Sequence, residues 1–462
     1  MRGYTLIVFC SIALLSLSSI GYCQNNQAAV GDLNGDGHPD VVVANPSLNN
    51  IGVFLNAGSG TLGAGAFLGV SGRPDSISLA DINGDGHLDI ILVEVDSSGA
   101  SHLQVMAGDG AGNFAAPAEI PTGGNSPITN PVVADFNGDG HPDIAFGSNA
   151  GQPQVTILFG DGHGGFSAPR VIPVANDTTF AAGLVLLDAN KDSKPDLVLN
   201  TARVTSGFLH ESFLLLNDGA ANFSVSHLGN AGFAGDTAGW VTAVADFDND
   251  GFVDLLFGPV TTPYIMFGDG HGGSLFALTG PSLFRAPQGF AADIDGNQTI
   301  DLASPTGTYV PGNGHGGFGD PISLALPQGS TLIAVADMNG DGKPDFVVQS
   351  GTSVAVVLNS LTAPANISAS TQLQLSLSAA TTSVGVPVTL SASALSYGGT
   401  PTGSVTFFDG AQSLGSAALN PYGVAAISTS FSAGGVHNLT ASLIGTLDPT
   451  TNTRNPSGTR NL

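Results

Sequence analysis

Short apolar runs alternate with polar, glycine-rich turns through residues 24–360, and the third unit shows the pattern most clearly. Its apolar run Pro131–Ala134 leads into an acidic loop, which is followed by Ile144–Gly147 and Gln154–Phe159. A Gly-rich turn then precedes Phe166–Val171. Short apolar runs that are bounded by glycine turns are typical of β-strands. The sequence therefore predicts four short strands in each unit.

A nine-residue acidic loop follows the first apolar run of every unit, and seven copies of it occur. The copies are Asp32–Asp40, Asp81–Asp89, Asp135–Asp143, Asp188–Asp196, Asp246–Asp254, Asp293–Asp301 and Asp337–Asp345. Successive copies begin 44 to 58 residues apart. Four strands with their turns need about 45 residues, so this period is typical of propeller blades or stacked repeat units.

Positions 1, 3, 5 and 9 of every loop are Asp or Asn. Calcium prefers six to eight oxygen ligands, and this spacing supplies side-chain oxygens around a sharp turn at position 6, with a backbone carbonyl at position 7. An EF-hand loop would close with Glu at position 12, whereas these loops keep Asp at position 9. A simple Asx-rich hairpin turn does not explain why four oxygen-bearing positions recur in all seven loops. The sequence therefore predicts up to seven calcium sites.

The predicted ligands are the residues at positions 1, 3, 5, 7 and 9, where position 7 contributes only its backbone carbonyl. They are Asp32, Asn34, Asp36, His38, Asp40, Asp81, Asn83, Asp85, His87, Asp89, Asp135, Asn137, Asp139, His141, Asp143, Asp188, Asn190, Asp192, Lys194, Asp196, Asp246, Asp248, Asp250, Phe252, Asp254, Asp293, Asp295, Asn297, Thr299, Asp301, Asp337, Asn339, Asp341, Lys343 and Asp345. The loops at Asp188 and Asp293 are expected to be the poorest sites, because Ser193 and Gln298 replace the glycine of the turn. The Asp293 loop is expected to be the weakest, since Asn297 also replaces a carboxylate.

Histidine and tryptophan allow other interpretations. His38, His87 and His141 stand at position 7, and three more histidines lie in the Gly-rich turns. They would indicate a transition metal only if two imidazoles converged, and surface turn residues are the simpler interpretation. Trp240, which precedes a predicted strand, is expected in the core, with a sugar-stacking platform as the alternative.

Composition narrows the class of protein further. The chain of 462 residues contains 65 Gly and 27 Pro with only 10% charged residues, which argues against long amphipathic helices. Its net charge of −26 argues against nucleic acids, anionic lipid and polyanionic glycans as partners. Six loops with three aspartates each and one loop with four hold 22 of the 36 acidic residues. The acidity is therefore concentrated at the predicted cation sites.

Residues 1–23 resemble a secretory signal peptide, with Arg2, an apolar run Leu6–Leu17 and a small-residue region before Cys23. A membrane anchor is the alternative, but the run is shorter than the ~20 residues that a span needs. Both cysteines, Cys10 and Cys23, lie in this segment. We therefore expect cleavage near Cys23 and a secreted or cell-surface chain without disulfides or a transmembrane span.

The Gly-rich turn identifies a resemblance. Phe159-Gly160 and Gly165-Phe166-Ser167-Ala168-Pro169 resemble the FG-GAP and VCBS repeat family. This resemblance implies a seven-bladed β-propeller over residues 24–360, similar to the head of integrin α subunits. No strand precedes the first unit, so residues 361–371 are expected to be a linker or the last outer strand of the seventh blade.

The acidic loops end before Gln372, and alternating stretches such as Val388–Ala392 and Ser404–Phe408 then predict a small β-sandwich. Ser383–Thr389 and Thr400–Phe407 resemble a bacterial Ig-like domain, which is expected over residues 372–446. Residues 447–462 form a polar tail in which no final strand is apparent. The predicted fold is therefore all-β, a propeller followed by a small Ig-like sandwich.

Catalysis is not expected, although polysaccharide lyases use related propellers. All three lysines lie inside the acidic loops, and we find no Ser/His/Asp or paired-carboxylate arrangement apart from the calcium ligands. The preferred interpretation is a calcium-binding extracellular module for adhesion to a glycan or protein; a structural surface or matrix component without a specific ligand is the alternative. Any ligand is expected opposite the loops, at the long connections Asn200–Glu211 (with Arg203 and His210) and Leu228–Gly239 (with Phe233).

Overall fold

The computed structural model describes residues 22–23, 27–124, 127–149, 151–174, 180–204, 208–228, 240–258, 264–272, 274–279, 289–314, 316–362, 372–377, 382–395, 402–420, 423–444 and 457–461. Every regular element in these ranges is a β-strand. The predicted signal peptide lies outside the described residues except for Tyr22–Cys23. The prediction of an all-β chain is confirmed.

The strands from residue 22 to residue 357 form seven antiparallel sheets, which we number in chain order. The first sheet contains β2 (Ala28–Gly31), β3 (Asp40–Asn45), β4 (Asn50–Phe54) and β5 (Ala66–Gly69). The second contains β6 (Arg73–Ala80), β7 (Asp89–Val95), β8 (Ser101–Met106) and β9 (Ala118–Ile120). The third contains β10 (Val132–Ala134), β11 (Asp143–Asn149), β12 (Pro153–Leu158) and β13 (Arg170–Pro173). The fourth sheet contains β14 (Phe180–Leu187), β15 (Asp196–Val204), β16 (Phe208–Asn217) and β17 (Phe223–His227). The fifth contains β18 (Trp240–Ala245), β19 (Asp254–Gly258), β20 (Tyr264–Gly268) and β21 (Ser274–Thr279). In this fifth sheet β1 (Tyr22–Cys23) pairs with β18. The sixth sheet contains β22 (Phe290–Ala292), β23 (Asp301–Ala303), β24 (Thr308–Val310) and β25 (Ile322–Ser323). The seventh contains β26 (Thr331–Ala336), β27 (Asp345–Ser350) and β28 (Ser353–Val357).

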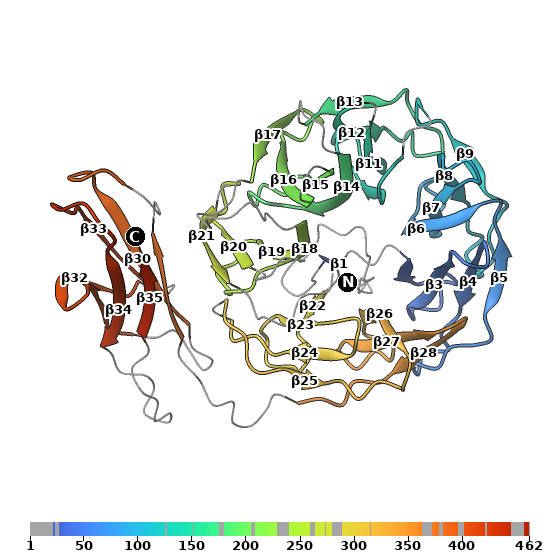
Figure 1. The fold of residues 1–462 in the computed structure, drawn as a ribbon. Coiled ribbons are helices and arrows are strands. Elements are labelled where there is room, and N and C mark those ends of the chain that lie inside the picture. The colour runs from blue at the N-terminus through green and yellow to red at the C-terminus, as the bar shows by residue number, and fades with distance from the viewer. Residues whose placement is uncertain are drawn as a thin grey trace.

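The seven sheets are arranged radially in a ring, with the first strand of each sheet on the inside (Figure 1). Each sheet shares a hydrophobic cluster with the next sheet. For example, Val42 and Ile51 of the first sheet pack with Ile90 and Leu92 of the second. These side chains are almost completely buried, so the apolar faces of the strands pack between the sheets. The predicted propeller architecture is confirmed.

Within the described residues, side-chain contacts join the first and last sheets of the ring. The seventh sheet contains three strands within the described ranges, and residues 358–362 add no strand to it. Val41 and Phe54 of the first sheet share a buried cluster with Ile333 and Val347 of the seventh. Hydrophobic burial therefore holds the first and last sheets together.

The third unit matches its predicted strands with one correction. Strands β10, β11 and β12 form where the apolar runs predicted them. The fourth strand was predicted at Phe166–Val171, but β13 begins at Arg170, and Phe166 makes only an isolated bridge with Gly160. The backbone first has to complete the Gly-rich turn, so pairing with β12 starts later than the apolar pattern indicated.

The connection that we expected at Asn200–Glu211 is wrong for most of its length. Residues as far as Val204 continue β15, and those from Phe208 continue β16, with Ala202 paired to His210 and Arg203 paired to Leu209. Strand pairing satisfies the backbone hydrogen bonds that a loop would leave open. Residues 229–239, which include Phe233, lie outside the described residues. Arg203 and His210 therefore lie on paired strands and not on the loop expected for the ligand patch.

The C-terminal part forms two sheets, which are β29 (Gln372–Leu377), β30 (Val388–Leu395) and β33 (Val424–Thr429), and β32 (Gln412–Ala418), β31 (Ser404–Asp409), β34 (Asn438–Ile444) and β35 (Ser457–Asn461). Leu390, Val405 and Leu439 lie in one core between the two sheets, as expected for a sandwich. The polar tail 447–462 was expected outside it, but β35 pairs with β34. A polar edge strand carries no hydrophobic alternation, so the sequence pattern did not reveal it.

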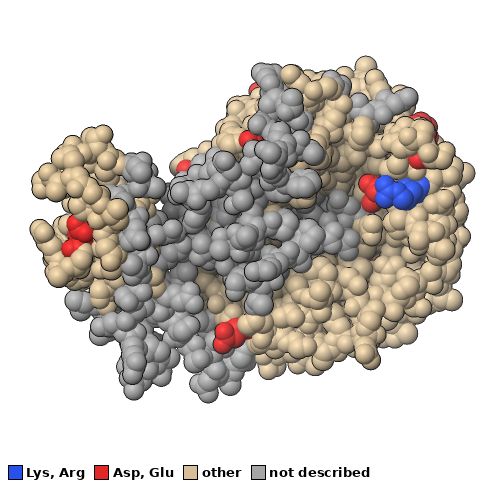
Figure 2. All heavy atoms as spheres, in the orientation of Figure 1, with Lys and Arg blue, Asp and Glu red and all other residues tan. Residues whose placement is uncertain are grey.

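On the face drawn in Figure 2, charged side chains are few and isolated among the described residues. The described part of the chain contains no helix long and apolar enough to cross a membrane.

Candidate functional site

The aspartate at position 9 of each loop is a buried structural clamp. Asp143 exposes 0% of its surface. Its Oδ2 accepts a hydrogen bond from the Phe136 amide at 2.9 Å, and its Oδ1 accepts one from the Gly160 amide at 2.9 Å. The same two bonds occur at Asp40, Asp89, Asp196, Asp254, Asp301 and Asp345. Position 9 therefore joins the acidic loop to the Gly-rich turn in all seven sheets.

The residues that meet this clamp from the turn were not predicted from the sequence. They are Asn56, Gly108, Gly160, Asn217, Gly268, Gly312 and Asn359. Each is Gly or Asn, and in the first six a glycine follows two residues later. This recurring spacing was the available signal, but only the folded hairpin shows that the amide at its first residue points at a carboxylate.

Positions 1, 3 and 5 fold the loop around their own oxygens. In the first sheet, the Asp32 carboxylate accepts hydrogen bonds from the amides of Gly35 and Gly37 at 2.8 and 2.9 Å. Asn34 Oδ1 accepts one from the Asp36 amide at 2.9 Å. The acceptor oxygens are thus brought to the inside of the turn, which is the arrangement that a cation-binding loop requires.

The sharp turn at position 6 has the left-handed conformation in every loop. Gly37, Gly86, Gly140, Gly251 and Gly342 have φ between 85° and 88°. Ser193 and Gln298 take the same turn with φ of 63° and 69°. The prediction that these two residues must adopt a glycine-like conformation is confirmed, and each carries the associated strain.

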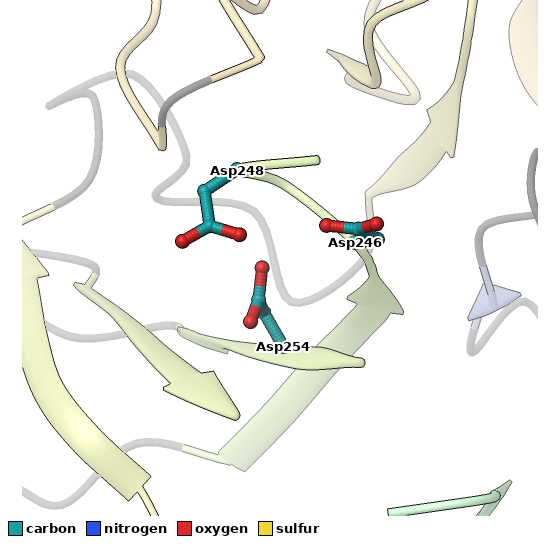
Figure 3. A group of neighbouring side chains, drawn as sticks. All are labelled: Asp246, Asp248 and Asp254. Atoms are coloured by element: carbon teal, nitrogen blue, oxygen red, sulfur yellow. The ribbon is translucent and has the colours of Figure 1, made fainter. Parts of the chain in front are cut away.

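Two loops bring three carboxylates together. Ligand atoms of Asp246, Asp248 and Asp254 lie within 4.8 Å of one another, and the same holds for Asp293, Asp295 and Asp301. In Figure 3 the carboxylates of Asp248 and Asp254 face each other, with that of Asp246 beside them. Positions 1, 3 and 9 thus converge, and each group could hold a metal ion. The Asp293 loop, expected to be the weakest, is one of these two.

Burial and mutual repulsion raise the pKa of these carboxyl groups. Burial, followed by the charge of Asp248, raises the pKa of Asp254 to about 9, and burial raises the pKa of Asp301 to about 8. Burial, followed by the charge of Asp250, raises the pKa of Asp248 to about 7. Burial also raises the pKa of Asp40, Asp143 and Asp196 to about 6. Without a cation the charged forms are unfavourable, because few counter-charges are near.

Unpartnered oxygens in the same two loops fit a bound cation. Asp250 Oδ2 and Asp295 Oδ2 are buried and have no hydrogen-bond partner. Asp295 is only 3% exposed. A buried carboxylate oxygen without a partner is costly, and a divalent cation would supply the missing interaction. The residues at positions 1, 3, 5 and 9 therefore suit a hard cation with oxygen ligands.

The position 7 side chains cover the glycines of the neighbouring turn. A Cβ atom added to Gly58, Gly110 or Gly162 would collide with the ring of His38, His87 or His141, respectively. Within the described residues, no group that could hold a metal includes a histidine. These rings therefore pack against the turn of their own sheet, in agreement with the simpler interpretation.

Trp240 links two sheets. It is the first residue of β18, is partly buried, and donates a hydrogen bond from Nε1 to the Thr201 carbonyl of β15 at 3.0 Å. This position matches the expectation of a packing role more closely than that of an exposed platform.

Neighbouring loops are connected through the carbonyl at position 2. The carbonyl oxygens of Leu33, Phe136 and Phe247 accept hydrogen bonds from amides in the turn of the next sheet, namely Gly112, Ala221 and Gly316. Side-chain amides of Asn56, Asn217 and Asn359 make equivalent bonds to Met338, Phe136 and Ile294. A change in one acidic loop can therefore be transmitted directly to the adjoining sheet.

A pocket of about 510 Å³ opens between the loops of the first three sheets. Its lining includes Asp32, Asp81 and Asp135 at position 1, together with His87 and His141. The pocket thus lies on the face that carries the acidic loops and Gly-rich turns. This is the opposite face from the one where the sequence analysis expected a ligand.

Comparison with known families assigns the repeats and the sandwich. Residues 32–92 and 81–146 match the FG-GAP-like repeat, and residues 375–459 match the bacterial Ig-like domain (group 3). Mouse cartilage acidic protein 1 is 27% identical over 175 residues, which are 31% of this chain and 27% of that protein. The chain therefore spans about a quarter of the length of this curated relative.

Two solved lectins resemble the chain. One is an Agrocybe aegerita lectin described as recognising non-reducing terminal N-acetylglucosamine, with 19% identity, 67% of this chain and 81% of that chain covered, and a TM-score of 0.48. The other is the BP39L lectin of Burkholderia pseudomallei, with 14% identity, 75% and 97% covered, and a TM-score of 0.47. The sequence matches and the geometry together lead to one conclusion: the chain combines FG-GAP-like repeats with a C-terminal bacterial Ig-like domain.

Proposed function

We propose that the chain is an extracellular binding module whose propeller is held in shape by calcium and which attaches to a glycan or protein. The observation that supports the calcium assignment is the convergence of three carboxylates in each of two acidic loops, both of which leave a buried carboxylate oxygen without a partner. Oxygen-only donors and a loop that turns at position 6 suit calcium better than softer transition metals. Other ions with oxygen ligands, such as Mg²⁺, are outcomes of the test.

Calcium would act here as a structural ion. Each clamp joins an acidic loop to a Gly-rich turn, and the turns of five sheets hydrogen-bond to the loop of the preceding sheet. A cation held at positions 1, 3, 5 and 9 would fix the first hairpin of a sheet and, through these bonds, its neighbour. Because the only cysteines are in the predicted leader, we expect no disulfide to replace this role.

The pocket between the first three sheets is the proposed place for a ligand. It combines carboxylates, imidazoles and glycine backbone, which could hydrogen-bond the hydroxyl groups of a sugar or the polar groups of a peptide. The Asp32 carboxylate already accepts backbone amides of its own loop, so a direct catalytic role for it is not proposed. We propose binding without catalysis and, from the N-terminal pattern, a secreted or cell-surface location.

Glycan-array and protein-array binding in calcium-containing buffer tests this function. We expect capture of a defined ligand by the full chain, and a loss of capture when His87 and His141 are both replaced by Ala. The matched control is His163→Ala, in a turn outside the pocket lining. Wild-type protein that is folded and calcium-loaded but captures nothing on either array would favour a matrix component without a specific ligand.

A further inference from the structure

The seven loops differ at position 3, where five carry Asn and two carry Asp248 or Asp295. In four of the five Asn loops, the amide nitrogen donates a hydrogen bond to the carboxylate at position 5. These bonds are Asn34 to Asp36 at 3.0 Å, Asn137 to Asp139 at 2.9 Å, Asn190 to Asp192 at 3.2 Å and Asn339 to Asp341 at 3.1 Å. Such a loop satisfies its position 5 carboxylate without a cation.

The two Asp loops cannot do this, because a carboxylate at position 3 has no N–H to donate. Asp248 leaves Asp250 Oδ2 without a partner, and in the next sheet Asp295 Oδ2 is itself unpartnered. Position 5 is exposed in all five Asn loops, whereas Asp250 and Asn297 are partly buried. A cation that binds to an Asp loop therefore breaks no amide–carboxylate hydrogen bond. It also supplies a partner for a buried carboxylate oxygen that has none.

We propose that the Asp246 and Asp293 loops form a tight class of cation sites that fills first and empties last, whereas the loops with Asn at position 3 exchange their cation more readily. This inference rests on the proposed cation binding and concerns its order. Both loops belong to adjacent sheets, whose residues Phe247, Ile265 and Leu302 share one core. The tight sites therefore stabilise one joint of the ring, between the fifth and sixth sheets.

The turn residue Gln298 does not weaken this ranking. It takes the turn with a φ of 69°, close to the φ of 63° at Ser193, so the two non-glycine loops share this strain and it does not set the Asp293 loop apart. Asn297 Oδ1 accepts hydrogen bonds from the amide and hydroxyl of Thr299, which hold the position 5 oxygen in place. The three carboxylates at positions 1, 3 and 9 converge without any rearrangement.

The predicted order of affinities is tested by measuring calcium binding to the full chain. Protein that has been stripped of metal is titrated with calcium in competition with a chromophoric chelator. Wild type should show two sites that bind at least about tenfold more tightly than the rest, because a cation that enters a loop with Asn at position 3 must first break an amide–carboxylate hydrogen bond. Asp248→Asn with Asp295→Asn should remove this tight class. The converse substitution, Asn137→Asp, places a carboxylate at position 3 of the third loop and should therefore add one tight site. This loop is suitable because it keeps glycine at positions 4 and 6.

The outcomes separate the two proposals. Wild-type protein that binds no calcium would refute the proposed function itself. Calcium bound in a single class, or a tight class that survives the double substitution, would overturn the ranking and leave the proposed function intact. If the double variant does not fold, Asn137→Asp decides alone, since an unchanged number of tight sites in it would also overturn the ranking.

Discussion

The side-chain amide of Asn56 donates a hydrogen bond of 2.7 Å to the carbonyl oxygen of Met338, which lies 282 residues later in the chain. The donor belongs to the Gly-rich turn of the first sheet and the acceptor to the acidic loop of the seventh. Asn56 also contacts its own loop through the Pro39 carbonyl at 3.1 Å. One buried amide therefore connects two acidic loops at the joint where the chain's first and last sheets meet.

Asn56→Ala should destabilise the ring by about 1–3 kcal/mol, because it leaves the buried Met338 carbonyl without this donor. The matched control is Asn217→Ala, whose amide donates to Phe136 in the same way. Phe136 keeps a second donor, the Ala221 amide at 2.9 Å, so this variant should lose less. Urea unfolding in calcium gives both values, and an equal or larger loss for Asn217→Ala would contradict the closing role of Asn56.

Asp143→Asn should destabilise the protein even when no cation is present. The substitution replaces one of two acceptor oxygens by an NH₂ group that would face the Phe136 or Gly160 amide, and we expect a loss of about 1–3 kcal/mol. Asp139→Asn is the control, because Asp139 is exposed and its Oδ1 can still accept from the His141 amide. Unfolding is measured in calcium-stripped buffer. Equal stability of the two variants there would show that position 9 acts only as a ligand.

Calcium-stripped protein should become less stable as pH rises. The pKa of Asp254 is raised from 3.8 to about 9 and that of Asp301 to about 8, both chiefly by burial. A carboxyl group with a raised folded-state pKa contributes its stability at low pH and loses it as pH rises through the folded value. We therefore expect the melting temperature of stripped protein to fall between about pH 5 and pH 9.

A bound cation reverses this trend, since it favours the ionised carboxylates. The increase in melting temperature on adding calcium should thus grow from pH 5 to pH 9. A stripped protein whose melting temperature rises over this range would mean that these carboxyl groups are ionised and satisfied without a cation.

The repeated loops made most of the fold predictable. Four oxygen-bearing positions at fixed spacing, with apolar runs on either side, indicated strands, period and candidate ligands, because these are local properties of the chain. The clamp at Asp143 was not predictable in the same way, since its second partner, Gly160, is fixed only when the hairpin pairs β11 with β12. The bond from Asn56 to Met338 depends on ring closure, which no local pattern encodes.

Two element boundaries were predicted wrongly for the same reason. Residues 200–211 were read as a connection and residues 447–462 as a tail, because neither shows regular hydrophobic alternation. In the structure, pairing of β15 with β16 and of β34 with β35 places residues 200–204, 208–211 and 457–461 in sheets through backbone hydrogen bonds. The low rank given to the Asp293 loop rested on Gln298 at the turn and on the amide of Asn297, and these local features do not show that three of its carboxylates converge.

The dependence of thermal unfolding on calcium tests the central claim most directly. The 462-residue chain is stripped of metal, its bound calcium is counted by equilibrium dialysis, and its melting temperature is recorded with chelator and with calcium. A cation-held propeller should bind several calcium ions and melt at a clearly higher temperature when loaded, because each site held at a hundredfold excess over Kd adds about 2.7 kcal/mol. A chain that binds no calcium and melts at the same temperature in chelator and in calcium would contradict the account.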